Sequence, residues 1–476
     1  MKTNKDIKVL RSRMNPVEER GGSNGLFAET IPVWYGRSGK VDPEWLSACK
    51  EQRNLTKVLM EEIASPLNLG KAYQKVKSNG GSAGVDKMTV DELQGWLGLN
   101  LEQLREQLLN DSYEPQVIRG VKIPKPSGGT RQLGIPTVID RLVQQAIHQV
   151  LNVQYDRTFS IYSYGFRANK SAHQALKQAG KYVAAGKCFI VDLDLEKFFD
   201  EVNHHRLMWV LSTRIGDQRV LRLINRYLKA GLLQEGLTEQ RIKGTPQGSP
   251  LSPLLSNIIL DELDKELDHR GYSYVRYADD VKIFVVSQQK ATEVKTKITT
   301  FITGNLKLKV NESKSRVCRG YEINFLGHSI LNDGTLGLSH ASEQRLKDKI
   351  REATRRNRGV SLSEIIKELR TKLQGWLNYF RYARMTKRME KIDGWMRRKL
   401  KCFRLKQCKR PIGVVRWLRQ LGVSERECWL TALSGKGWWR LSNSPGPAAG
   451  MSNMWFTQQG FYSLSLNYKS LHRKLP

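Results

Sequence analysis

The chain has 476 residues, of which 39% are hydrophobic, and this length and composition predict two to four domains with well-filled cores. Its formal net charge of +33 excludes a cationic main partner and indicates a polyanion. The excess is uneven, because residues 343–476 contain 31 Lys and Arg against 9 Asp and Glu, a net charge of +22 by subtraction. Solvated helix faces do not explain so one-sided a surplus, so we expect nucleic acid as the partner.

Other patterns exclude further classes of protein. The six cysteines, at positions 49, 188, 318, 402, 408 and 428, form no CxxC pair, so we expect reduced thiols and neither disulfides nor a zinc site. The basic N-terminal residues are followed by no apolar segment, and no apolar run approaches the length that spans a bilayer. We therefore predict a cytoplasmic protein with no membrane partner.

The N-terminal part of the chain is the least informative. Residues 1–48 are polar, contain glycine and show no clear period, so we expect an irregular segment. From 55 to 76, apolar residues recur at helical spacing and predict one helix with a buried stripe that includes Leu59, Ile63 and Leu67. Three glycines follow at 80, 81 and 84; composition alone fits either a turn between helices or a backbone that approaches RNA closely.

Residues 117–136 predict two short strands around a "PSGG" turn, a hairpin that carries Lys122, Lys125 and Arg131. Cations at the tip of a hairpin can clamp a triphosphate, although generic surface lysines give the same pattern.

The run "CFIVDLDLEKFFD" (188–200) predicts a strand that ends in acidic residues. Strand periodicity puts Asp192 and Asp194 on the same face, so periodicity does not choose between them as functional residues. Of the two aromatic residues that follow, Phe198 and Phe199, we expect at least one to belong to the core.

The sequence "YSYVRYADDVKIFVV" predicts strand, tight turn and strand, with Asp279 and Asp280 at the hairpin tip. Asp at a turn is common for reasons of backbone geometry alone. Here the Gly/Pro-rich loop from Gly244 leads into an apolar helix up to Asp264, between the two acidic segments. If the acidic segments meet, they form a site for two Mg²⁺ that catalyse nucleotidyl transfer.

After residue 338 the pattern becomes helical. A capping box formed by Ser361 and Glu364 opens an apolar stripe that runs to Trp376 and Phe380. The next helix offers cations that would track a phosphate backbone: Arg397, Arg398, Lys399, Lys401, Arg404, Lys406, Lys409 and Arg410. Five tryptophans follow, at 417, 429, 438, 439 and 455; because indoles are usually buried, we assign one of the five to contact with nucleic acid.

Several of these motifs together resemble a known family. "IPKPSGGTRQLGIPTVIDRLVQQAI", "YSYGFRANKSAHQAL", "VDLDLEKFFDEVNHH", "GTPQGSPLSPLLSNI", "YADD", "LKLKVNESKS" and "FLGH" occur in the order of the reverse transcriptase blocks. From about Leu67 to the C-terminus the chain resembles the group II intron maturases of bacteria. His472 is the only histidine after His340, so no endonuclease histidine cluster is present, and the resemblance is to the compact group IIC class.

The resemblance implies an α+β right-hand polymerase with a helical thumb (domain X) and a small helical DNA-binding domain. We accordingly divide the chain into an N-terminal extension (1–48), fingers (49–188), palm (189–338), thumb (339–410) and a C-terminal DNA-binding domain (411–476).

It also implies roles for individual residues. Two Mg²⁺ would be bound by Asp194, Asp279, the more peripheral Asp280 and the Leu195 carbonyl. In the family, the residues that match Lys125, Arg131, Gln247 and Phe199 contact the incoming deoxynucleotide, and Phe199 would exclude a 2′-hydroxyl. Lys314 occupies the place from which a lysine can protonate pyrophosphate, although a plain surface lysine fits equally. The eight cations from Arg397 to Arg410 would bind intron RNA.

The implied function is twofold: a maturase that binds group II intron RNA to promote splicing, and a reverse transcriptase that copies the RNA template from a DNA primer at the target DNA, using deoxynucleotide triphosphates. Such a ribonucleoprotein would associate with the bacterial nucleoid. Three alternatives stay open: a splicing factor without polymerase activity, a reverse transcriptase used for host repair or defence, and an RNA-directed RNA polymerase, which Phe199 opposes.

Overall fold

The computed structural model describes residues 57–124, 128–234 and 237–473, which form two compact units. The first comprises the described residues up to Ala175 together with Phe189–Val317. The second comprises Leu176–Cys188 and the described residues from Cys318 onward. The finer division into five segments stays a prediction.

The first unit begins with helices. Their bounds are α3 (Leu59–Ile63), α4 (Pro66–Asn79), α5 (Leu93–Leu109) and α6 (Val138–Asp156). The prediction of one helix over 55–76 was wrong, because the chain breaks at Ser65, whose side chain caps α4, and Pro66 opens the new helix. The break turns Leu67 away from the core, and this side chain is 71% exposed.

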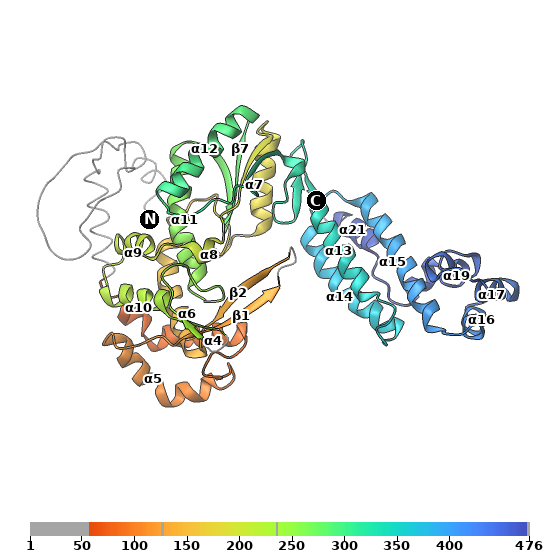
Figure 1. Cartoon of the computed structure of the whole chain (residues 1–476), viewed down its shortest axis with the longest axis horizontal. Coiled ribbons are helices and arrows are strands. Elements are labelled where there is room, and N and C mark those ends of the chain that lie inside the picture. Colours follow the sequence, from red (N-terminus) through yellow and green to blue (C-terminus); the bar gives the residue numbers. More distant parts are fainter. Residues whose placement is uncertain (1–56, 125–127, 235–236, 474–476) are drawn as a thin grey trace, which may run out of the picture. The chain divides into compact units, whose positions relative to one another are not determined.

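The predicted hairpin at 117–136 is confirmed. Strands β1 (Ile118–Pro124) and β2 (Thr130–Ile135) pair antiparallel, and β4 (Leu232–Gln234) and β5 (Leu237–Glu239) extend the sheet in the order β2-β1-β4-β5. The hairpin is drawn in orange in Figure 1. Lys125 lies outside the described residues.

A second sheet holds the acidic segments. Its strands are β3 (Phe189–Leu193), β6 (Ser273–Tyr277), β7 (Asp280–Val285) and β8 (Arg316–Arg319), in the order β6-β7-β3-β8. Two strands far apart in the sequence, β3 and β7, are thus neighbours at the centre. Helix α11 (Ser252–His269) packs against β6, and α12 (Gln288–Gly304) packs against β3 and β7.

The apolar helix predicted after the Gly/Pro-rich loop is confirmed as α11, and its predicted apolar residues are all buried: Leu254, Leu255, Ile258, Ile259 and Leu263. The remaining helices of this part of the chain are α7 (Ala172–Ala184), α8 (Phe198–Glu201), α9 (His204–Ser212) and α10 (Gln218–Lys229). One hydrophobic cluster, from Leu59 to Leu308, joins these helices to both sheets.

The second unit is mainly helical. Its first elements are η1 (Gly320–Glu322), β9 (His328–Ile330), β10 (Leu336–Leu338), α13 (His340–Ala353), α14 (Leu362–Phe380) and α15 (Thr386–Gln407). The capping box of Ser361 and Glu364 is confirmed at the start of α14. The C-terminal helices are α16 (Pro411–Gln420), α17 (Glu425–Ala432), α18 (Trp438–Leu441), α19 (Pro445–Gly450), α20 (Asn453–Gln458) and α21 (Leu464–Arg473).

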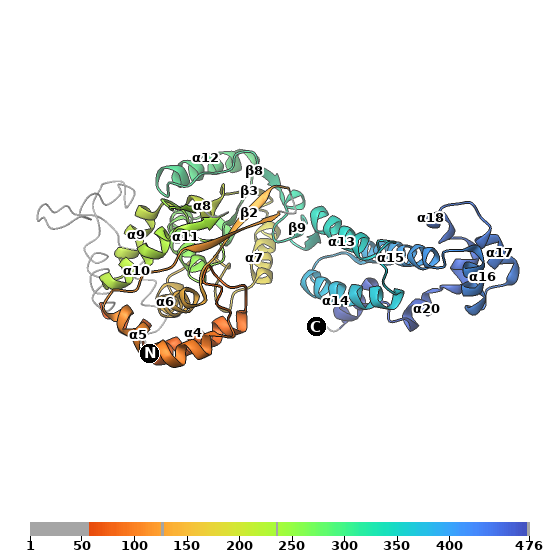
Figure 2. The same cartoon turned by 60° about the horizontal axis from the view of Figure 1, so that its bottom comes forward.

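These C-terminal helices share a core with the three long helices. Figure 2 shows α16, α17 and α18 around one end of α15. A single cluster runs from Leu338 to Tyr468 and includes apolar residues of α13, α14 and α15. Among the described residues, no helix is both long enough and apolar enough to span a membrane.

Candidate active site

The register of the central sheet brings the acidic segments together. In the β3–β7 ladder, Asp192 pairs with Lys282 and Leu193 with Val281. Continued by one residue, this register sets Asp194 opposite Asp280. Strand β6 ends and β7 begins at the pair Tyr277–Asp280, so Asp279 lies in a two-residue turn between them. The end of β3 therefore meets the β6–β7 turn.

A buried lysine distinguishes the two acidic residues of β3. Lys282 is only 3% exposed and its ammonium forms ion pairs with the carboxylates of Asp192, at 2.5 Å, and of Asp280. Asp192 is thus paired to a strand cation that cross-strand geometry places beside it. Asp194 lies beyond the end of the strand, and its side chain is 44% exposed.

Asp194 and Asp279 interact electrostatically. Burial raises the pKa of Asp279, and the negative charge of Asp194 raises it further, while Arg131 and Lys282 act in the opposite direction. Burial also raises the pKa of Asp280, against the opposing effect of Lys282. Within the described part of the chain no three or more His, Cys, Asp or Glu side chains are grouped closely enough to hold a metal ion. The described site is therefore a carboxylate pair with Asp280 held to one side by Lys282.

The loop after Leu308 holds the Asp194 backbone from the other side. Ser315 Oγ lies 3.0 Å from the Asp194 nitrogen and accepts its hydrogen bond, and the Asn311 N–H donates to the Asp194 carbonyl at 2.8 Å. Leu195 is buried and forms a bridge with Val310. These bonds bring the Lys314 ammonium to 3.7 Å from Asp194 Oδ2, so the loop joins two predicted site residues.

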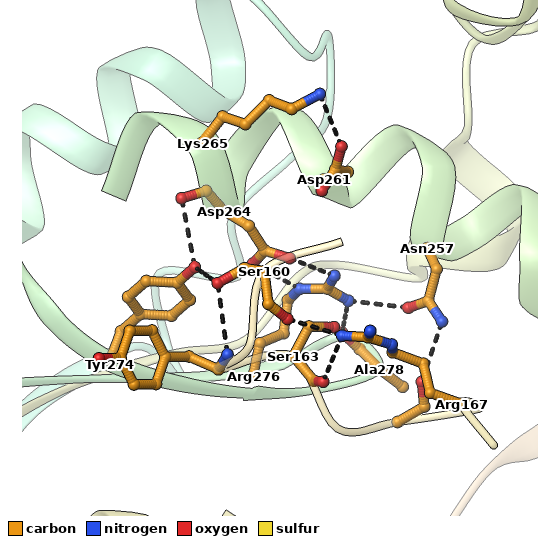
Figure 3. Close-up of polar contacts among 12 residues, drawn as sticks. Ser160, Ser163, Arg167, Asn257, Asp261, Asp264, Lys265, Tyr274, Arg276 and Ala278 are labelled. Carbon is orange, nitrogen blue, oxygen red and sulfur yellow. Dashed lines mark hydrogen bonds and ion pairs between the residues drawn. The ribbon is translucent and has the colours of Figure 1, made fainter. Parts of the chain in front are cut away.

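The catalytic-type turn is fixed by a buried guanidinium that sequence reasoning did not single out (Figure 3). Arg276 is fully buried; its Nε and Nη2 donate to Asp264 at 2.7 and 2.5 Å, and its Nη1 donates to the Ala278 carbonyl at 3.0 Å. Ala278 has a φ of 57°, a left-handed conformation that favours glycine. The carbonyl bond therefore helps to hold the turn in a strained conformation.

The same guanidinium connects the turn to α11 and to the loop before α7. Asn257 Oδ1 accepts from Arg276 Nη1 at 3.0 Å, and Asn257 Nδ2 donates to the Gly165 carbonyl at 2.9 Å. Gly165 is packed so closely on the turn that a Cβ there would lie 3.0 Å from Ala278 Cα. A charged residue within the strand run "YSYVRY" was the available signal for Arg276, as was the lysine in "VKIFVV" for Lys282.

Phe199 is fixed by the loop before α11. Thr245 N–H donates to the Phe199 carbonyl at 2.6 Å, and Gly244 N–H donates to the Val202 carbonyl at 2.8 Å. Phe198 is the buried member of the aromatic pair, while Phe199 is partly buried, in accordance with the expectation that one ring belongs to the core. The same loop carries Gln247, whose amide lies 3.4 Å from Asp200 Oδ1.

The structure gives Ser249 and Gly84 packing roles. Ser249 is buried and donates a hydrogen bond to Gln144 of α6. A Cβ on Gly84 would lie 2.6 Å from Thr137 Cα, so close packing against α6 accounts for this glycine. Both residues therefore connect loops to α6.

The predicted cations lie on α15 and in the short link to α16. Four of them stack on aromatic rings of the same unit: Arg398 on Trp439 and Arg404 on Trp417, each at 3.9 Å, Arg397 on Phe461 at 5.7 Å, and Lys399 on Trp395 at 5.6 Å. Burial lowers the pKa of Lys401, and Arg397 adds to the effect. Their contact with nucleic acid stays a prediction.

Comparisons with known proteins agree with this geometry. Residues 123–330 match the family described as "Reverse transcriptase (RNA-dependent DNA polymerase)", which includes both acidic segments. Residues 343–422 match "Group II intron, maturase-specific domain", which includes α14 and α15.

Two curated relatives extend the match. Protein YkfC of Escherichia coli is 31% identical over 353 residues, 66% of this chain and 92% of that protein. The group II intron-encoded protein LtrA of Lactococcus lactis is 29% identical over 360 residues, 59% of this chain and 60% of that protein. Among solved structures, a telomerase from Candida albicans covers 64% of this chain and 63% of that chain at 13% identity, with a TM-score of 0.41.

Proposed function

The chain belongs to the group II intron reverse transcriptases and maturases, and from this premise we propose how its own residues serve the two activities. The observation that carries the polymerase proposal is the electrostatic contact between Asp194 and Asp279, which the β3–β7 register makes neighbours.

The carboxylate pair fits the metal that the reverse transcriptase family uses, Mg²⁺. Mg²⁺ is usually bound by one or two carboxylates and completes its coordination with water and substrate phosphates, so a pair of aspartates is sufficient. Asp194, Asp279 and the Leu195 carbonyl would hold two such ions, with Asp280 peripheral because Lys282 pairs with it. When bound, the ions stabilise the attacking and leaving oxygens of nucleotidyl transfer.

The other residues bind and select the deoxynucleotide triphosphate. Arg131, whose charge acts on Asp279, would neutralise the triphosphate, with Lys125 as its predicted companion. Phe199 would pack under the sugar and leave no space for a 2′-hydroxyl, while Gln247 contacts the nucleotide from the loop that fixes Phe199. Lys314, 3.7 Å from Asp194, would protonate the pyrophosphate leaving group.

For the maturase activity, we assign binding of the group II intron RNA to the cations of α15 and of the link to α16. The lack of an endonuclease and the group IIC class belong to the same proposal, as do the target DNA and the priming of synthesis at the target site. The nucleotide sequence around the gene tests this part, because it either contains a group II intron structure or does not.

The polymerase proposal is tested by Asp194→Asn and Asp279→Asn in primer extension on an RNA template. Each variant should lose at least about a hundredfold in rate, because the carboxylate charge that binds the ions is removed. Asp192→Asn is the matched control: it lies on the same strand and face but pairs with Lys282, and it should lose less than about tenfold.

Melting temperatures of the three variants exclude unfolding as the cause. If Asp194→Asn and Asp279→Asn extend primers as fast as the parent, the site assignment is wrong.

A further inference from the structure

The five C-terminal tryptophans differ in their surroundings. Trp417, Trp438 and Trp455 pack against the hydrophobic cluster of the second unit, and Trp417 and Trp455 also contact each other edge to face. Trp429 and Trp439 are 37% and 41% exposed. Three of the five are therefore explained as core, and two present aromatic surface to solvent.

Trp439, on α18, is surrounded by cations. The guanidinium of Arg398 lies 3.9 Å from the centre of its ring, and the Lys399 ammonium lies 5.6 Å away. Arg398 Nε and Nη2 also donate to the Trp439 carbonyl, at 3.2 and 2.9 Å, so the guanidinium is fixed over the indole from both sides of the contact. The sequence neighbours include two further exposed cations, Lys436 and Arg440.

Trp429, on α17, has acidic surroundings instead. Its indole N–H donates to Glu425 Oε1 at 2.7 Å, and the Glu425 carboxylate is paired with Arg419 at 2.6 Å. Exposed apolar side chains, Leu430 and Leu433, flank it in the sequence. A carboxylate at the ring edge repels phosphate, so this tryptophan is the less suitable of the two for nucleic acid.

We infer that Trp439 is a stacking platform for an unpaired nucleobase, and that Arg398, Lys399, Lys436 and Arg440 bind the phosphates on either side of that base. Every base has a π face, so an exposed indole binds single strands with little sequence preference, and a stacked guanidinium adds cation–π stabilisation. The ring stays 41% exposed in spite of the Arg398 stack, which leaves surface for a base. This inference deepens the proposed function and rests on it, because it assumes that the chain binds nucleic acid.

The test uses the full chain and fluorescence polarisation with a 20-nucleotide dT strand, the matching U strand, and an abasic strand of equal charge. Trp439→Leu, which keeps the apolar packing but lacks a π face, should weaken binding of the base-containing strands about tenfold, from the known cost of losing one stacked base. Its binding of the abasic strand should stay within about twofold of the parent. The dT and U arms identify whether DNA, RNA or both use the platform.

Two variants serve as controls. Trp439→Phe should recover most of the affinity, since it restores an aromatic face, and Trp429→Leu should bind all strands within about twofold of the parent. Arg398→Ala should instead reduce the salt dependence of binding, because it removes a phosphate contact.

Primer extension separates the two levels of the proposal. If the parent extends primers and Trp439→Leu binds every strand as the parent does, the platform is refuted while the polymerase function stands. If Trp439→Leu weakens binding of the abasic strand as much as that of the dT strand, stacking is also refuted. A parent that fails to extend primers would refute the proposed function itself.

Discussion

Replacing Gly165 by alanine tests whether the position of the β6–β7 turn controls catalysis. A Cβ at this position would lie 3.0 Å from Ala278 Cα and from the Tyr277 carbonyl carbon, and less than 3.0 Å from the Ala278 nitrogen. Ordinary contacts of a Cβ are at 3.4–4 Å, so the turn and the Gly165 loop must separate by at least 0.4 Å. The atoms that must move are backbone, and no side-chain rotation relieves the overlap.

The displacement acts directly on the proposed site. Arg276 holds the Ala278 carbonyl, and Asn257 holds the Gly165 carbonyl, so both sides of the contact are fixed to α11. Overpacking of this kind costs about 1–3 kcal/mol of stability. Because a misplacement of about 1 Å can reduce a catalytic rate about a hundredfold, we expect Gly165→Ala to lower the extension rate about ten- to a hundredfold.

The assay is single-turnover primer extension at saturating deoxynucleotide, together with thermal unfolding. Gly98→Ala is the matched control: Gly98 lies within α5, no atom lies within 4 Å of the added Cβ, and alanine stabilises a helix interior. This control should keep the parent rate. A Gly165→Ala protein that extends primers within about threefold of the parent would refute the claim that the turn needs this backbone contact.

Three further predictions follow from the buried groups. Phe199→Ala should raise the kcat/KM for ribonucleotides relative to deoxynucleotides about tenfold, and an unchanged ratio would remove Phe199 as the sugar-selecting residue. Arg276→Met should lower the free energy of unfolding by about 3–5 kcal/mol, since it leaves Asp264 charged and buried; the double variant Arg276→Met, Asp264→Leu should recover much of this loss, and no recovery in chemical denaturation would contradict the explanation. Burial pushes the pKa of Asp217 up, but bonds from Arg219 and from the Met60 N–H outweigh it and leave that pKa below its ordinary value. The stabilisation by Asp217 is therefore complete above the unfolded pKa of about 3.9 and is lost as the pH falls through the folded value, so the stability difference between parent and Asp217→Asn should shrink as the pH is lowered from about 5 to about 3.

The sequence by itself determined the elements that local chemistry specifies. The hairpin of β1 and β2 follows from alternation around a Gly-rich turn, and α14 follows from its capping box and apolar stripe. Ser65–Pro66 was a local signal of the same kind that the helical period obscured, because Leu67 continued the spacing across the break. The order of the motifs also determined the family, since seven blocks in one order are far more specific than any single motif.

Only the tertiary structure decided which polar groups meet. Asp192 and Asp194 are equivalent by period, and the β3–β7 register separates them by pairing Asp192 with Lys282. Arg276 and Trp439 became informative only when their neighbours were known, because a lone arginine in a strand or a tryptophan near a lysine is consistent with core, surface or site. The physical reason is that periodicity fixes the face on which a side chain lies, whereas charge pairing and exposure depend on partners distant in the sequence.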